Sequence, residues 1–179
     1  MADFPVHPDQ LSNTWLSQAL GCEVNNFTSR ALGEGVGVIG LVNRVELDTD
    51  QGSTSIIAKF PAVSADNRAI AHAYSMYLRE YQFYTEIQPQ VPVRSPECLF
   101  AAYDFDTHEF VLLLEDLQDF TLGDQVSGCS EAECQLIVES IAAFHRNAWE
   151  PSAAIGPHNT EAQAQGMIMG FEMGWPVVR

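Results

Sequence analysis

The chain contains a single lysine, and its neighbours suggest a specific chemical use for that side chain. Lys59 follows the apolar, β-branched run Ser55-Ile56-Ile57-Ala58, and arginine supplies the rest of the basic charge. The run predicts a strand, and a lysine on a buried strand is costly unless its charge is paired. Because a compact ammonium can contact phosphate oxygens and a carboxylate together, Lys59 is a candidate phosphate ligand.

Two further features fit that chemistry. Gly33, Gly35 and Gly37 lie upstream of Lys59, and Glu80 lies downstream on a predicted helix. Glycines let backbone amides approach phosphates without interference from a Cβ. The Glu80 carboxylate can pair with Lys59 and hold it in place. A dinucleotide-binding fold would need a helix directly after the glycines, whereas a second strand is predicted there.

A change of composition follows the run Val111-Leu112-Leu113-Leu114. The next residues are Glu115, Asp116 and Leu117, and the chain beyond about residue 118 is predominantly helical in pattern. A strand end at such a joint exposes backbone N–H and C=O groups. We expect these groups to be able to bind the edge of an adenine ring.

Hydrophobic periodicity predicts the elements that position these residues. We expect a leading helix, a sheet of five antiparallel strands, one long helix packed on that sheet, and a later helix opened by the capping box Ser130-Glu131-Ala132-Glu133. The fold class is therefore α+β. The predicted helices span 8–20, 64–87 and 130–149, and the predicted strands span 23–32, 38–47, 54–60, 98–105 and 109–115.

The composition excludes several classes of partner. A net charge of −16 argues against nucleic acid and anionic membrane surfaces, since both need a basic footprint. No apolar run is long enough to span a bilayer, and the N-terminus lacks the pattern of a signal peptide, so we expect a cytoplasmic protein. The four cysteines form no Cys-x-x-Cys pair, and we expect free thiols.

In order and spacing, five motifs resemble the N-terminal half of the protein-kinase-like small-molecule phosphotransferases. That superfamily includes aminoglycoside phosphotransferases, choline kinases and ecdysteroid-kinase-like proteins, and the resemblance covers about residues 20–150. The matching segments are Ile57-Ala58-Lys59-Phe60, Arg79-Glu80-Tyr81-Gln82-Phe83-Tyr84, Leu113-Leu114-Glu115-Asp116-Leu117, Gly123-Asp124-Gln125-Val126-Ser127-Gly128 and Ala143-Phe144-His145-Arg146-Asn147-Ala148-Trp149.

The resemblance implies a role for each candidate site residue. Lys59 would bind the α- and β-phosphates of ATP, Glu80 would orient Lys59, and the glycines would cover the phosphates. The linker residues would hold adenine through main-chain atoms. The cofactors implied are ATP and Mg²⁺, and the implied fold is a kinase-like N-lobe over residues 1–116, followed by a hinge and the first helices of a helical C-lobe over 117–179. The candidate cofactor-binding residues are Lys59, Glu80, Gly33, Gly35, Gly37, Glu115, Asp116 and Leu117.

The sequence departs from the family where the chemistry is expected. The catalytic loop of the family has the pattern His-Gly-Asp-x-x-x-x-Asn, and none of the five histidines fits it. His145-Arg146-Asn147 has Asn where protein kinases carry Asp. We therefore expect the N-terminal portion of a kinase that phosphorylates a hydroxyl of a small molecule, inactive by itself, with catalytic and metal-binding residues on the C-lobe of the same protein. The alternative is a degenerate kinase-like lobe that binds nucleotide or protein without catalysis. The acceptor stays open.

Overall fold

The computed structural model describes residues 3–32, 39–121, 123 and 126–148. Its strands are β1 (Val24–Ala31), β2 (Gly40–Thr49), β3 (Gly52–Pro61), β4 (Cys98–Tyr103) and β5 (Phe110–Glu115), and its α-helices are α1 (Asn13–Leu20), α2 (Ala65–Ala73), α3 (Met76–Gln82) and α4 (Glu131–Ala148). Short helical turns lie at Pro8–Gln10, Phe83–Ile87 and Gln88–Gln90.

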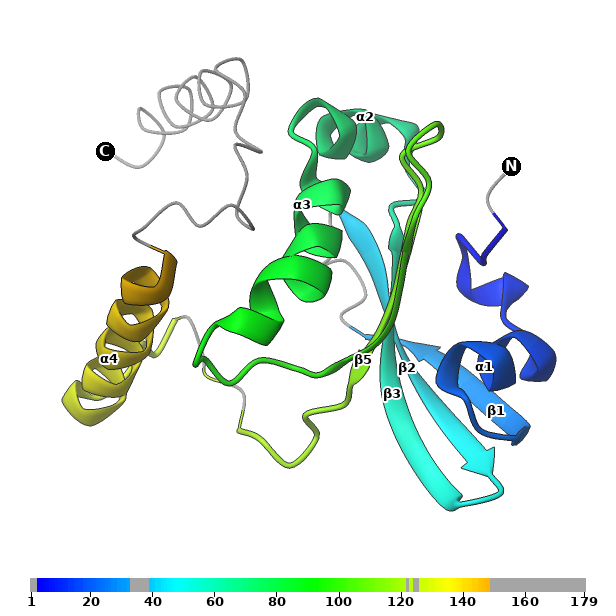
Figure 1. Ribbon diagram of the computed structural model, residues 1–179, viewed down its shortest axis with the longest axis horizontal. Coiled ribbons are helices and arrows are strands. Elements are labelled where there is room, and N and C mark those ends of the chain that lie inside the picture. Colours follow the sequence, from blue (N-terminus) through cyan, green and yellow to red (C-terminus); the bar gives the residue numbers. More distant parts are fainter. Residues whose placement is uncertain (1–2, 33–38, 122, 124–125, 149–179) are drawn as a thin grey trace.

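The five strands form one antiparallel sheet in the order β1-β2-β3-β5-β4, which confirms the predicted α+β class. Figure 1 shows the long β2–β3 hairpin extending beyond β5, while β1 pairs with β2 as far as Thr49, next to the hairpin turn. Because β5 pairs with β3 over Ile56–Lys59 only, it ends beside the middle of that hairpin. The linker that follows β5 therefore starts next to the strand that carries Lys59.

The two faces of the sheet bury two separate cores. Helix α1 covers one face, where Leu16 belongs to a core that includes side chains of every strand, and α3 covers the other, where Tyr77 packs with β5 (Figure 1). Residues of β5 alternate between the two cores, and the run Val111–Leu114 is fully buried as predicted. Ile39, within the predicted strand 38–47, precedes β2 and packs against the α3 core, whereas Leu41 of β2 packs against the α1 core.

The prediction of one helix from Ser64 to Ile87 is wrong. Ser64 does cap α2, but the helix ends at Tyr74 and restarts at Met76. Ser75 between them has a φ of 49°, in the left-handed region, which costs a non-glycine residue about 1 kcal/mol or more. The break allows α3 to take its own direction, and its Tyr77 ring stacks on Phe110 of β5.

The capping box of α4 is confirmed. The Glu133 carboxylate accepts from the N–H and the hydroxyl of Ser130, and the Ser130 hydroxyl accepts from the N–H of Glu133. Four apolar residues of this helix are 48% to 64% exposed, namely Leu136, Ile137, Val138 and Ile141. The predicted end of the helix at Trp149 lies outside the described residues.

Two further expectations can be compared with the structure. All four cysteines are free thiols, as predicted. Among the described residues, none of the helices combines the length and the apolar character that crossing a membrane requires.

Candidate functional site

Lys59 lies on the face of the sheet that α3 covers. Its neighbours Ala58 and Phe60 are fully buried in the core beneath α1, so the alternation of side chains along β3 directs Lys59 to the opposite face. Its closest cross-strand neighbours are Val42 of β2 and Leu112 of β5. The side chain retains 26% of its exposure, so the ammonium is partly withdrawn from water and open to a ligand.

Glu80 reaches Lys59 from α3. Tyr77 and Glu80 are three residues apart, which places them on the same face of the helix, and Tyr77 is buried against the sheet. The Glu80 carboxylate forms an ion pair with the Lys59 ammonium, and Glu80 is 30% exposed. The structure therefore brings together the two residues that the sequence paired, although their contact with a nucleotide stays a prediction.

Tyr84, which lies near Glu80, and Cys98, which lies near Tyr84, are both uncharged groups. Burial raises the pKa of Tyr84 to about 12, and the nearby Glu80 carboxylate adds to the rise. Burial also raises the pKa of the Cys98 thiol. Both groups therefore stay uncharged at neutral pH and do not compete with Glu80 for the lysine.

The linker begins with Glu115, which is tied to the segment before β4. Its N–H donates to the C=O of Glu97 at 2.9 Å, and its carboxylate accepts from Arg94 at 2.6 Å and from the N–H of Glu97 at 3.0 Å. The hydrogen bond from Arg94, followed by the one from Glu97, lowers the pKa of Glu115. This N–H is therefore occupied, and an adenine ring would have to use other groups of the linker.

Leu117 offers such a group. Its C=O accepts from the N–H of Phe120 at 3.0 Å, whereas its own N–H makes no hydrogen bond to any described residue. A backbone N–H at the start of a linker can donate to an acceptor nitrogen of a purine. Among the three predicted linker residues, Leu117 therefore presents a main-chain N–H that has no partner within the described part of the chain.

The Asp116 side chain has a structural role that the sequence did not reveal. Its carboxylate lies 2.7 Å from Nε and 2.9 Å from Nη2 of Arg44, and it accepts from the hydroxyl of Ser55 at 2.7 Å. Asp116 is only 3% exposed. The linker is thereby fastened to both strands of the β2–β3 hairpin. The alternation of the strands offered no signal that Arg44 would meet a residue so distant in sequence.

A groove of about 1040 Å³ runs beside the linker. Its lining does not include Lys59, which lies further along β3, or Glu80 of α3. The lining comes from β1, the outer part of the β2–β3 hairpin, the residues near the start of β4 and the linker, and includes Arg30, Arg44, Glu46, Ser55, Asp116 and Gln118. Because the ion pair and the groove lie at successive positions along β3, an extended ligand could contact both.

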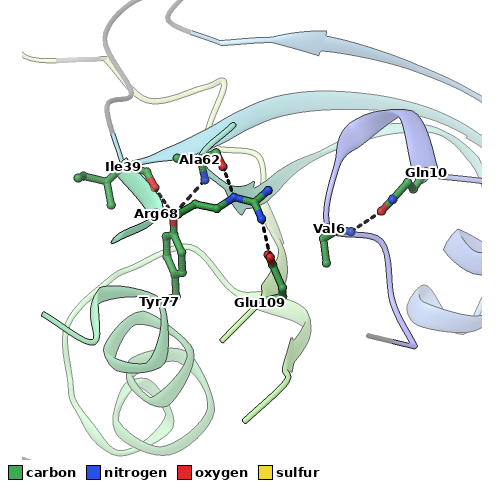
Figure 2. A network of polar contacts seen from close by, with 7 residues as sticks. All are labelled: Val6, Gln10, Ile39, Ala62, Arg68, Tyr77 and Glu109. Atoms are coloured by element: carbon green, nitrogen blue, oxygen red, sulfur yellow. Dashed lines mark hydrogen bonds and ion pairs between the residues drawn. The ribbon is translucent and has the colours of Figure 1, made fainter. Parts of the chain in front are cut away.

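The predicted phosphate-covering glycines, Gly33, Gly35 and Gly37, lie outside the described residues. The chain is described again from Ile39, whose C=O accepts from the hydroxyl of Tyr77 at 2.7 Å (Figure 2). The sequence did not single out Tyr77 for this role, although its spacing of three residues from Glu80 was visible. Within the described residues no three His, Cys, Asp or Glu side chains are placed to hold a metal ion.

A comparison with protein-family models matches residues 35–150 to the ecdysteroid kinase-like family. This stretch contains Lys59, Glu80 and the whole linker. The chain belongs to the ecdysteroid kinase-like family. It is thus a member of the kinase-like small-molecule phosphotransferases, as the five motifs predicted.

The five-stranded antiparallel sheet and its helices are consistent with the N-lobe of a protein-kinase-like fold in this ecdysteroid kinase-like protein. Comparisons with curated proteins and with solved structures found no match. The kinase-like family generally uses ATP and Mg²⁺. The family match does not name an acceptor.

Proposed function

We propose that this chain supplies the ATP-binding part of a kinase that transfers a phosphoryl group to a hydroxyl of a small molecule. The observation that carries the proposal is the ion pair between Lys59 and Glu80. The pair joins a strand to a helix that is separated from it by another helix and a break. It holds the partly exposed ammonium of Lys59 on β3, the strand that pairs with β5, and the linker directly follows β5.

In this proposal each part of the site has one task. Lys59 contacts the α- and β-phosphates, and Glu80 fixes the position of its ammonium. The linker binds the adenine edge through its backbone, with the N–H of Leu117 as a donor, since this group has no partner among the described residues. Such enzymes act mainly by positioning the reactants and stabilising charge, and Lys59 supplies part of both.

The proposal for the domains follows the same division. Residues 1–116 would form the nucleotide-binding lobe, and residues 117–179 would form the hinge and the start of a helical lobe. The His-Gly-Asp-x-x-x-x-Asn pattern is absent from the sequence. We therefore expect the chain by itself to bind nucleotide without transferring phosphate. Bound Mg²⁺ would neutralise charge on the phosphates. In this proposal its protein ligands belong to the catalytic part of the C-lobe, and not to the residues named above.

The test is the substitution Lys59→Met, which removes the ammonium and keeps a long apolar side chain. Binding of ATP, measured by calorimetry, should fall below detection. The control is Arg146→Met, which removes the same charge from an exposed position on α4 and should bind like the wild type. Circular dichroism would show that both variants fold. Equal ATP affinity in the wild type and in Lys59→Met would refute the proposed role of Lys59.

One observation favours a second candidate function, a non-catalytic module that binds a protein. Helix α4 exposes Leu136, Ile137, Val138 and Ile141 by 48% to 64%, and an apolar patch of this kind marks an interface or a site of aggregation. Size-exclusion chromatography with light scattering separates the two functions. A soluble monomer favours the self-sufficient module, and aggregation favours an enzyme whose remaining lobe covers α4.

A further inference from the structure

The hydroxyl of Tyr77 joins three parts of the proposed nucleotide site. It donates to the C=O of Ile39 at 2.7 Å and accepts from the N–H of Ala62 at 3.0 Å (Figure 2). Ile39 is the first described residue after the glycine-rich segment, and Ala62 directly follows β3, three residues after Lys59. Tyr77 itself lies on α3, less than one turn before Glu80.

The ring of Tyr77 is held rigidly. It is 3% exposed and stacks on Phe110 of β5, with ring centroids 4.5 Å apart and planes inclined by 18°. Burial raises the pKa of the hydroxyl, so it keeps the proton that it donates to Ile39. A rigid ring with both hydrogen bonds satisfied is able to fix the spacing of the backbones that it joins.

Ala62 is held on its other side as well. Its C=O accepts from Nε of Arg68 on α2 at 2.5 Å, and Nη1 of Arg68 reaches the Glu109 carboxylate at 2.5 Å (Figure 2). Both backbone groups of Ala62 are therefore bound, one by each helix that follows β3. The end of the Lys59 strand is clamped between α2 and α3.

We propose that Tyr77 is a positioning residue of the phosphate end of the nucleotide site. Through its hydroxyl it holds Ile39, just before β2, and Ala62, at the end of the Lys59 strand, at a fixed spacing from the helix that carries Glu80. This inference rests on the proposed function. It also predicts selectivity, because the adenine end is fastened by a separate set of contacts, those of Asp116 with Arg44 and Ser55.

The selectivity provides the first readout. The substitution Tyr77→Phe keeps the stacked ring and removes the hydroxyl. It should weaken ATP binding about tenfold, which is near the lower end of the contribution of one hydrogen bond to a charged group, while adenosine affinity changes less than about twofold. A purely structural role would weaken both ligands equally. The control is Tyr81→Phe on the same helix, whose ring lies against Tyr103 and whose hydroxyl takes no part in this network.

A second readout needs no nucleotide. The chain has one lysine, so protein labelled with ¹⁵N-lysine gives a single Nζ signal that reports on the ion pair with Glu80. In Tyr77→Phe this signal should move toward its position in Glu80→Gln, and in Tyr81→Phe it should stay at the wild-type position. If Tyr77→Phe does not fold, Arg68→Met replaces it. This variant removes the hydrogen bond from Arg68 to the C=O of Ala62, and its ATP affinity, adenosine affinity and Nζ signal are measured in the same way.

The outcomes separate the inference from the proposed function. The role of Tyr77 is overturned if Tyr77→Phe has the same ratio of ATP affinity to adenosine affinity as the wild type, or if its Lys59 Nζ signal does not move. Either result overturns that role even when Lys59→Met abolishes ATP binding. If the wild type binds no ATP, the proposed function fails. The Nζ signal then still decides whether Tyr77 sets the position of Lys59 against Glu80.

Discussion

The buried carboxylate of Asp116 permits a quantitative prediction. The substitution Asp116→Asn keeps the size of the side chain and removes its charge. It leaves the Arg44 guanidinium, which is 22% exposed, beside a neutral amide. Asparagine has one side-chain oxygen, so Arg44 and Ser55, which donate to different oxygens of Asp116, can no longer both keep their acceptor. The linker should then lose its attachment to the hairpin.

Two limits bracket the size of the effect. Breaking a fully buried ion pair by removing one partner costs about 3–5 kcal/mol, whereas exposed pairs contribute about 0.2–1 kcal/mol. Asp116 is 3% exposed and Arg44 is 22% exposed, so the pair lies nearer the buried limit. We expect a loss of about 2–4 kcal/mol in the free energy of unfolding, which is a large part of the roughly 5–15 kcal/mol typical of a domain.

Urea unfolding at neutral pH measures this loss. For a slope of about 2 kcal/mol per molar, the midpoint should fall by about 1–2 M with the slope unchanged. The matched control is Glu115→Gln, the preceding residue, whose pair with Arg94 is 34% and 52% exposed. It should lower the midpoint far less, because water screens that pair.

A double variant tests the reasoning directly. Arg44→Met combined with Asp116→Asn removes the orphaned charge and should recover part of the stability lost in Asp116→Asn alone. A single-variant loss below about 1 kcal/mol would show that the carboxylate is solvated in solution. A double variant that is no more stable than Asp116→Asn would show that the unpaired guanidinium was not the cause.

Two more predictions concern the edges of the site. Gly40→Ala should destabilise the protein by about 1–3 kcal/mol, because the added Cβ would lie 2.8 Å from the C=O oxygen of Phe60, next to Lys59. The control Gly123→Ala should be neutral, because a Cβ at Gly123 would have nothing within 4 Å. Equal urea midpoints for the two variants would contradict this prediction. Burial, and then His108, lowers the pKa of His72 below 6.5, so the unfolded chain takes up this proton first and stability falls as the pH drops through about 6.5. His72→Gln should show a shallower fall between about pH 7.5 and 5.5, and a slope equal to that of the wild type would remove His72 as a cause.

Short-range patterns made much of the fold predictable. Short apolar runs, alternating in some strands and continuous in Val111–Leu114, identified all five strands to within a few residues, since such runs depend only on the local chain. The capping box of α4 was equally local, because its hydrogen bonds join residues three apart. The pairing of Lys59 with Glu80 came from a resemblance in motif order, and the family match and the ion pair are in agreement with it.

Other features depended on contacts between distant segments. The break at Ser75 was invisible because the periodicity continues through it, and the cost of its left-handed φ is tolerated where Tyr77 stacks on Phe110 and binds Ala62. The Asp116 carboxylate looked like one more linker residue until the hairpin brought Arg44 beside it.

The sequence by itself determined the strands, the helix caps, the family and the identity of the lysine and its carboxylate partner. These follow from local backbone preferences and from residue order. Only the tertiary structure decided that α3 turns away from α2, that Tyr77 joins the Lys59 strand to the Glu80 helix, and that Asp116 fastens the linker to the hairpin. The physical reason is that a buried polar group must find a partner, and which partner it finds depends on how distant segments pack.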